Sequence, residues 1–262
     1  QRRYEEAIVL FRQALALEPD LTIARNNLRE AQRLLSLQRS PAPAPDDLAW
    51  LPQNEPLLPV LRAVVRVVID GDPGAGTGWV IKREGNRLWV LTNRHVLTGE
   101  QSQRSSESIE VEFFSEPPAE QVRLRRPAQV VQSTAAGEEL DLALLVIDDA
   151  PPDIQALDIL PTAPGLNTNV RIVGHHNPDL PWGLERGFVS NRIQEQIMQV
   201  SQATIGRGSS GSPVINEQNQ VVGIIYEIST PNVAAGRDST AGFSYAYPPS
   251  IILGRLNYWG IH

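Results

Sequence analysis

Hydrophobic residues recur with a period of two in a dozen short segments between residues 61 and 247 of this 262-residue chain. Gly, Pro, Asn and Asp separate these segments, a pattern typical of β-strands joined by turns. Little sequence between them has a helical period, so the pattern predicts an all-β protein. The predicted strands are 61–69, 78–83, 87–92, 109–114, 122–133, 142–147, 169–174, 186–191, 196–201, 212–216, 220–228 and 242–247.

A proline-rich joint divides the strands into two sets of six. We therefore predict two six-stranded antiparallel β-barrels, at about 60–149 and about 165–248, because barrel closure removes exposed strand edges. The apolar segment 249–259 follows, with Pro249 placed for the first turn of a helix. We expect a C-terminal helix there.

The first 38 residues have a different, helical period. Apolar residues of YEEAIVLFRQALAL share one helical face, and Pro19 separates this helix from a second one. The segment resembles the second helix of a tetratricopeptide repeat (TPR) running into the next helix; an ordinary helical hairpin is the alternative. Such arrays need about three repeats, so we expect more of the array upstream of Gln1 and a protein partner for its helices. Residues 39–59 contain six prolines and are predicted to be a semi-rigid linker.

Composition excludes several classes of function. The net charge is −7 without a basic stripe, which argues against nucleic-acid binding. No apolar run is long enough for a membrane span, and the absence of cysteine excludes disulfides and thiolate chemistry. We expect a soluble protein of the cytoplasm or the periplasm. The chain begins at Gln1 without an initiator Met, so we expect a fragment of a longer protein, and a targeting segment upstream stays open.

His95 and Asp141 are candidates for a base and the acid that orients it. His95 lies in LTNRHVL, where a predicted strand ends in a polar turn, and Asp141 precedes the apolar run LALLVI. A half-buried carboxylate needs a partner, and a histidine ring N–H is a suitable one. Taken alone, His95 is better explained as a hydrogen-bonded structural histidine.

The segment GRGSSGSP, residues 206–213, supplies a candidate nucleophile. By itself it is explained equally well as a flexible polar turn. With a base and an acid elsewhere in the chain, its glycines allow consecutive N–H groups to point into one pocket that binds an oxyanion. We expect Ser210 to attack, and the N–H groups of Gly208 and Ser210 to form the oxyanion hole.

The chain order His95, Asp141, Ser210 separates the possible folds. An α/β-hydrolase runs from serine to acid to histidine, and a subtilisin-type enzyme from acid to histidine to serine. The order found here is that of chymotrypsin-type enzymes, whose fold consists of two β-barrels. It therefore agrees with the strand pattern.

Residues 60–256 resemble a trypsin-like serine peptidase of the cysteine-free bacterial branch, close to HtrA-type domains. The motifs that carry the resemblance are GTGWVI (76–81), LTNRHVL (91–97), DLALLVI (141–147), GFVS (187–190), RGSSGSPV (207–214) and GFSYAYP (242–248). Arg94 is bulky for its position in the family, and we expect its side chain to point outward. Ser212 replaces a glycine that is common there.

The resemblance implies an endopeptidase that forms an acyl-enzyme, acts on protein or peptide substrates and uses no cofactor. It places Thr204 at the floor of the substrate pocket, Tyr226, Glu227 and Ile228 along one wall, and Gly242 and Ser244 opposite. No acid matches the floor position, so we expect a small or medium uncharged side chain before the scissile bond. The alternative is a catalytically inactive scaffold, and a latent enzyme with a disordered oxyanion loop is a third possibility. Metal binding by His175 and His176 is not expected.

Overall fold

We analysed a computed structural model of the chain. It describes residues 2–18, 21, 24–25, 27–28, 31–32, 35, 54–69, 72–98, 108–114, 124–176, 181–203, 205–206, 208–229 and 243–261. The chain divides into an N-terminal helical unit within residues 1–53 and a β-rich unit within residues 54–114 and 125–262. Most of the expected linker 39–59 lies outside the described residues.

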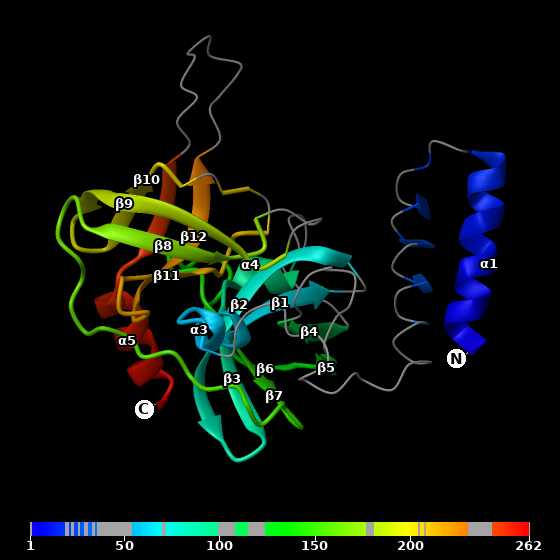
Figure 1. Ribbon diagram of the computed structural model, residues 1–262, viewed down its shortest axis with the longest axis horizontal. Helices are drawn as coiled ribbons and strands as arrows, with labels where there is room; N and C mark the ends of the chain where they lie inside the picture. The colour runs from blue at the N-terminus through cyan, green and yellow to red at the C-terminus, as the bar shows by residue number, and fades with distance from the viewer. Residues whose placement is uncertain are drawn as a thin grey trace, which may run out of the picture. The chain divides into compact units, whose positions relative to one another are not determined.

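Helix α1 (Arg2–Leu17) dominates the N-terminal unit (Figure 1). Its apolar face meets a second helical stretch, because Ile8, Ala31 and Leu35 are buried in one cluster. The expected tetratricopeptide-like hairpin stays a prediction. The opposite face of α1 leaves Val9, Leu10 and Leu17 exposed.

The β-rich unit begins with helix α3 (Leu58–Ala63), where the sequence pattern predicted linker and the start of a strand. Pro59 lies in the first turn of this helix, a position that needs no backbone N–H. The strands that follow form two groups. The first comprises β1 (Val64–Ile69), β2 (Asp72–Glu84), β3 (Arg87–Thr92), β4 (Ile109–Phe113), β5 (Leu124–Pro127), β6 (Gln129–Ser133) and β7 (Ala143–Ile147).

The first group forms a seven-stranded sheet in the order β5-β4-β1-β2-β3-β7-β6. The sequence predicted a six-stranded barrel here, and that expectation is not met. The single strand expected at 122–133 is interrupted at Pro127, which has no N–H to donate, so that β5 and β6 pair with opposite edges of the sheet. Only Ala128 separates β5 from β6, so the two edges of the sheet come together there, but among the described strands no pairing of β5 with β6 closes the sheet.

A buried ionic cluster joins three strands of this sheet. Glu112 on β4 is fully buried and accepts hydrogen bonds from Arg66 Nε on β1 (2.6 Å) and Arg125 Nε on β5 (2.9 Å). A buried carboxylate is tolerated only when its oxygens are satisfied in this way. The cluster therefore specifies the pairing of β5, β4 and β1.

The second group closes into a six-stranded barrel in the order β10-β13-β12-β11-β8-β9 (Figure 1), as the sequence predicted. Its interior is filled by Val170, Ile172, Val189, Met198, Val200, Val214, Val222, Ile225 and Ala246. The strands are β8 (Asn169–Gly174), β9 (Gly183–Ile193), β10 (Ile197–Ser201), β11 (Pro213–Ile215), β12 (Val221–Ser229) and β13 (Phe243–Tyr247).

Helix α5 (Pro249–Tyr258) follows the barrel, in agreement with the predicted C-terminal helix. Pro249 occupies its first turn, and Ile252 and Leu256 are buried on one side while the helix packs against β12. None of the described helices is both long enough and apolar enough to cross a membrane.

Candidate active site

His95 lies on the short helix α4 (Arg94–Thr98), which follows β3 after a single residue, Asn93. Its ring Nδ1 is hydrogen-bonded to Oδ2 of Asp141, and its backbone N–H donates to Oδ1 of the same carboxylate at 3.1 Å. One carboxylate therefore holds both the ring and the backbone of His95. The carboxylate accepts the Nδ1–H, and this tautomer leaves Nε2 as the basic nitrogen.

The environment of Asp141 keeps its carboxyl group ionised. Burial raises the pKa of Asp141, but the hydrogen bonds and charge of His95, together with the charge of Arg94, outweigh burial and lower the pKa below its usual value. The side-chain amide of Asn93 also donates to the backbone carbonyl of Asp141 at 2.7 Å. Asp141 is thus a fixed negative charge beside the imidazole at neutral pH.

Arg94 does not point outward as we expected. Its guanidinium donates to the carbonyl of Ala135, and its Nε lies 3.9 Å from Oδ1 of Asp141. A carbonyl and a carboxylate within reach of the same side chain explain the inward orientation, because each accepts from a guanidinium. Arg94 therefore adds positive charge to the Asp141 side of the site.

Ser210 lies in a loop made of two successive tight turns. The N–H of Ser209 donates to the carbonyl of Gly206 (3.1 Å), and the N–H of Ser212 donates to the carbonyl of Ser209 (2.9 Å). The third residue of each turn is a glycine with positive φ, Gly208 at 96° and Gly211 at 85°. Ser210 therefore occupies the second position of the second turn, as in a type II turn.

Neither of these glycines leaves room for a side chain. A Cβ atom on Gly211 would overlap the carbonyl oxygen of Thr77, and one on Gly208 would overlap the carbonyl oxygen of His175. The loop is thus in direct backbone contact with β2 on one side and with residue 175 on the other. This close approach explains the glycine-rich composition of the segment.

Thr77 on β2 connects the serine loop to the rest of the site. It is fully buried; its N–H donates to the carbonyl of Ser210 (2.9 Å), and its hydroxyl donates to the carbonyl of Gly208 (2.8 Å). The hydroxyl also accepts from the N–H of His175 (3.1 Å), and the Thr77 carbonyl accepts from Oγ1 of Thr92 (2.7 Å). We did not single out Thr77 from the sequence, although the motif GTGWVI contains it.

The loop also lies close to the helix that bears His95. A Cβ atom on Gly76 would be 2.6 Å from Cγ2 of Val96 and 3.2 Å from the carbonyl oxygen of Ser210. Val96 is the neighbour of His95. The segments of His95, Asp141 and Ser210 therefore converge, with a direct hydrogen bond between His95 and Asp141 and backbone contacts from Ser210 through β2.

His175 and His176 support the serine loop from the barrel side. Nδ1 of His176 is hydrogen-bonded to Oγ of Ser209 at 2.8 Å, and Nδ1 of His175 accepts from the N–H of Trp182 at 3.2 Å. The rings of His175 and Trp182 meet edge to face. Burial lowers the pKa of both histidines, that of His175 well below the usual value. No group of three His, Asp or Glu side chains in the described part of the chain could hold a metal ion.

The predicted substrate pocket is only partly described. Tyr226 stacks on Tyr247 with ring centroids 4.1 Å apart, and Ser244 is buried in the barrel. Thr204 and Gly242 lie outside the described residues, as do the side chains of Glu227 and Ile228. Their roles stay predictions.

The hydroxyl group of Tyr247 joins the barrel to the loop that carries Asp141. It donates to the carbonyl of Glu139 (3.0 Å) and accepts from the N–H of Asp141 (3.2 Å). Burial raises the pKa of Tyr247, so the hydroxyl stays protonated and remains a donor. Nothing in the sequence pattern indicated this link.

The structure combines a closed antiparallel barrel with a curled sheet. It places a histidine–carboxylate pair beside a glycine-bounded serine loop. These features together define the class of chymotrypsin-like serine peptidases. The sequence model of the trypsin-like peptidase domain matches residues 76–224, which is more than half of the chain. The protein therefore belongs to the trypsin-like peptidase family.

Individual relatives are distant. The chain is 24% identical over 194 residues to the serine protease Do-like HtrA of Bacillus subtilis. It is 26% identical over 182 residues to the magnetosome formation protease MamE of Paramagnetospirillum magneticum. The matches include 68% and 66% of this chain but only 38% and 22% of those two proteins.

Solved structures share the fold at low sequence identity. The inactive form of Rv3671c from M. tuberculosis has a TM-score of 0.59 at 18% identity, covering 84% of this chain and 95% of that one. The serine endoprotease from Yersinia pestis has a TM-score of 0.58 at 20% identity, covering 80% of this chain and 67% of that one. At these identities the similarity establishes the fold alone.

Proposed function

We propose that this chain is a serine endopeptidase in which Ser210, His95 and Asp141 form the catalytic triad. The observation that carries the proposal is the double hydrogen bond of Asp141 to His95, beside a loop whose backbone is held by Thr77. Family membership supports the same reaction class. The triad is recognised by such geometry and by the role of each group.

In the proposed reaction, Nε2 of His95 takes the proton of Ser210 as Oγ attacks the carbonyl carbon of a peptide bond. The tetrahedral oxyanion binds to the N–H groups of Gly208 and Ser210, and the imidazolium then protonates the leaving amine. Water, deprotonated by the same imidazole, hydrolyses the acyl-enzyme and restores Ser210. Asp141 holds the imidazole and stabilises its charged form throughout.

A fluorophosphonate probe tests the proposal, because such probes react covalently with activated serines. We expect the wild-type protein to be labelled and Ser210→Ala to be unlabelled. Asp141→Asn should slow labelling by a factor on the order of 10⁴, because loss of the orienting carboxylate lowers kcat by about that factor in chymotrypsin-like peptidases. Measuring labelling rates and peptide hydrolysis together checks both the nucleophile and the reaction.

Ser212 provides the matched control in the same loop. Its hydroxyl is buried without a hydrogen-bond partner among the described residues, so Ser212→Ala should keep wild-type labelling. A wild-type protein that neither reacts with the probe nor cleaves peptides would refute the proposal. It would support the alternative of a catalytically inactive scaffold. Labelling that persists in Ser210→Ala would assign the nucleophile to another residue.

We further propose that the N-terminal helices bind a protein partner in the manner of tetratricopeptide repeats. The paired helical stretches and the exposed apolar residues Val9, Leu10 and Leu17 support this proposal. Exposed apolar side chains on one face of a helix offer a surface to a further helix or to a partner. Substrate recruitment would then be separate from cleavage.

A further inference from the structure

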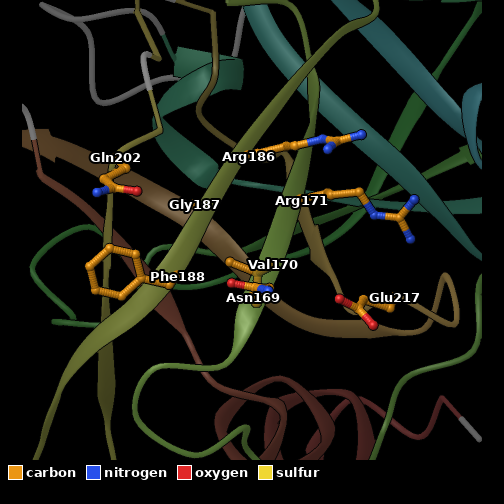
Figure 2. Close-up of a pocket in the computed structure, with 8 residues that line it drawn as sticks. All are labelled: Asn169, Val170, Arg171, Arg186, Gly187, Phe188, Gln202 and Glu217. Atoms are coloured by element: carbon orange, nitrogen blue, oxygen red, sulfur yellow. The ribbon is translucent and has the colours of Figure 1, made fainter.

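Two arginines lie directly opposite each other on the outside of the barrel. Arg171 on β8 and Arg186 on β9 are paired residues in the antiparallel register of these strands. Figure 2 shows both side chains extended in the same direction from neighbouring strands. Like charges in directly opposed positions destabilise a sheet unless another group compensates them.

Among the described residues, no carboxylate forms an ion pair with either arginine. Nη2 of Arg171 donates to the carbonyl of Asn216 (2.7 Å) and to Oδ1 of Asn219 (2.8 Å), which are neutral acceptors. Its Nε is buried without a hydrogen-bond partner. The two neutral acceptors hold the Arg171 guanidinium in place without removing its charge, and Arg186 is exposed beside it.

These arginines line a pocket of about 380 Å³ (Figure 2). Phe188, which is half-buried, provides apolar surface, and Glu217 lines the pocket from the β11–β12 turn. Two guanidinium groups and one carboxylate leave the pocket with one net positive charge. A singly charged anion would compensate this charge, and the carboxylate of Glu217 would repel a second negative charge.

We propose that this pocket binds one carboxylate group of a peptide, either an Asp or Glu side chain or a chain terminus. Guanidinium groups bind carboxylates through charge-assisted hydrogen bonds, and the exposed Arg186 is free to donate them. Arg171 adds a positive charge that its contacts with Asn216 and Asn219 hold in place. Phe188 packs against the aliphatic part of the same ligand.

The pocket lies away from the serine loop. Asn169 and Phe188 pair at one end of β8 and β9, while Gly174 and Gly183 pair at the end beside His176. The two ends are five register positions apart, roughly 16 Å, and the Arg171–Arg186 pair is three positions, roughly 10 Å, from the Gly174–Gly183 pair. The site is therefore distinct from the proposed catalytic centre, and binding there does not depend on catalysis.

Nuclear magnetic resonance titration of the ¹⁵N-labelled full chain tests the proposal. The probes are acetyl-Ala-Glu-Ala-amide, which carries a side-chain carboxylate, and acetyl-Ala-Gln-Ala with a free C-terminus. Acetyl-Ala-Gln-Ala-amide has no carboxylate and is the negative control. We expect saturable chemical-shift changes of the backbone amides of residues 169–171 and 186–188 with at least one carboxylate peptide. We expect no such changes with the control. The peptide that binds identifies the source of the carboxylate.

Three variants, each changing the net charge by one unit, distinguish a built site from general electrostatic attraction: Arg186→Gln and Arg192→Gln remove a positive charge, and Glu217→Gln removes a negative one. Arg186→Gln should weaken binding about tenfold or more, because a charge-assisted hydrogen bond is lost. Glu217→Gln should tighten it, because the repelling carboxylate is removed. Arg192→Gln, on the same strand but outside the pocket, should leave affinity unchanged.

Arg171 is left intact because it also holds the β11–β12 turn. The proposal would be overturned if neither carboxylate peptide caused saturable chemical-shift changes. It would also be overturned if the amide peptide caused changes as large as those of the carboxylate peptides. An Arg192→Gln effect as large as that of Arg186→Gln would overturn it as well.

Discussion

At the scale of single residues, the buried His175 and the half-buried His176 contact the serine loop, and their protonation links its stability to pH. His176 bonds Ser209, the neighbour of the proposed nucleophile, and the carbonyl of His175 lies against Gly208. Burial lowers the pKa of both rings, so both are neutral in the folded protein at pH 7. The unfolded chain exposes them to water, where a histidine titrates near pH 6.5.

We predict that folding stability falls as the pH drops below about 6.5, because the unfolded chain then binds protons that the folded chain does not. Each histidine contributes at most about 1.4 kcal/mol per pH unit between its lowered pKa and its usual value. His176→Gln keeps a hydrogen-bonding side chain without titrating in this range. Urea unfolding at pH 7.5 and pH 5 should therefore show a smaller loss of stability in His176→Gln than in the wild type; equal losses would contradict the prediction.

At the scale of elements, β2 and the serine loop support each other through backbone contact. Gly211 has φ of 85° and faces the carbonyl of Thr77, so any side chain there is both strained and obstructed. The loop can therefore keep its conformation only with glycine at this position.

Gly211→Ala should lower the free energy of unfolding by about 1–3 kcal/mol, since left-handed strain and overpacking add. It should also reduce fluorophosphonate labelling, because Ser210 is displaced. Gly254→Ala is the matched control: its Cβ would meet no atom within 4 Å on helix α5. This control should raise stability by up to about 1 kcal/mol through helix propensity. Urea denaturation checks both variants, and equal effects would refute the packing explanation.

Element boundaries show where local patterning is informative. Strands β3 and β8 span the residues predicted for them, because alternation of apolar and polar residues is a local property. Helices α3 and α4, of six and five residues, were not predicted, since such short helices have too few turns to show a period. The break between β5 and β6 was also missed, although Pro127 signalled it.

At the scale of the whole molecule, Tyr247 couples the barrel to the Asp141 loop of the sheet. Tyr247→Phe keeps the ring stacked on Tyr226 but leaves the N–H of Asp141 and the carbonyl of Glu139 without this partner. We predict a loss of about 1–3 kcal/mol in stability and slower fluorophosphonate labelling, because Asp141 is less firmly held.

Tyr258→Phe is the control for this change. Tyr258 ends helix α5 and is 79% exposed, so loss of its hydroxyl should alter neither stability nor labelling. If Tyr247→Phe, like Tyr258→Phe, changed neither the thermal unfolding temperature nor the labelling rate, the coupling between barrel and sheet would be disproved.

The sequence by itself determined the mostly-β architecture, the C-terminal helix and the residues on which the proposed chemistry rests, because periodicity and short motifs are local. Only the tertiary structure decided which β-group closes, how Arg94 turns inward, and that Thr77 and Tyr247 hold the site together. Thr77 bonds a residue 131 positions away, and Tyr247 one 106 positions away. Hydrogen bonds over such separations depend on how the strands pair, and no local pattern encodes that pairing.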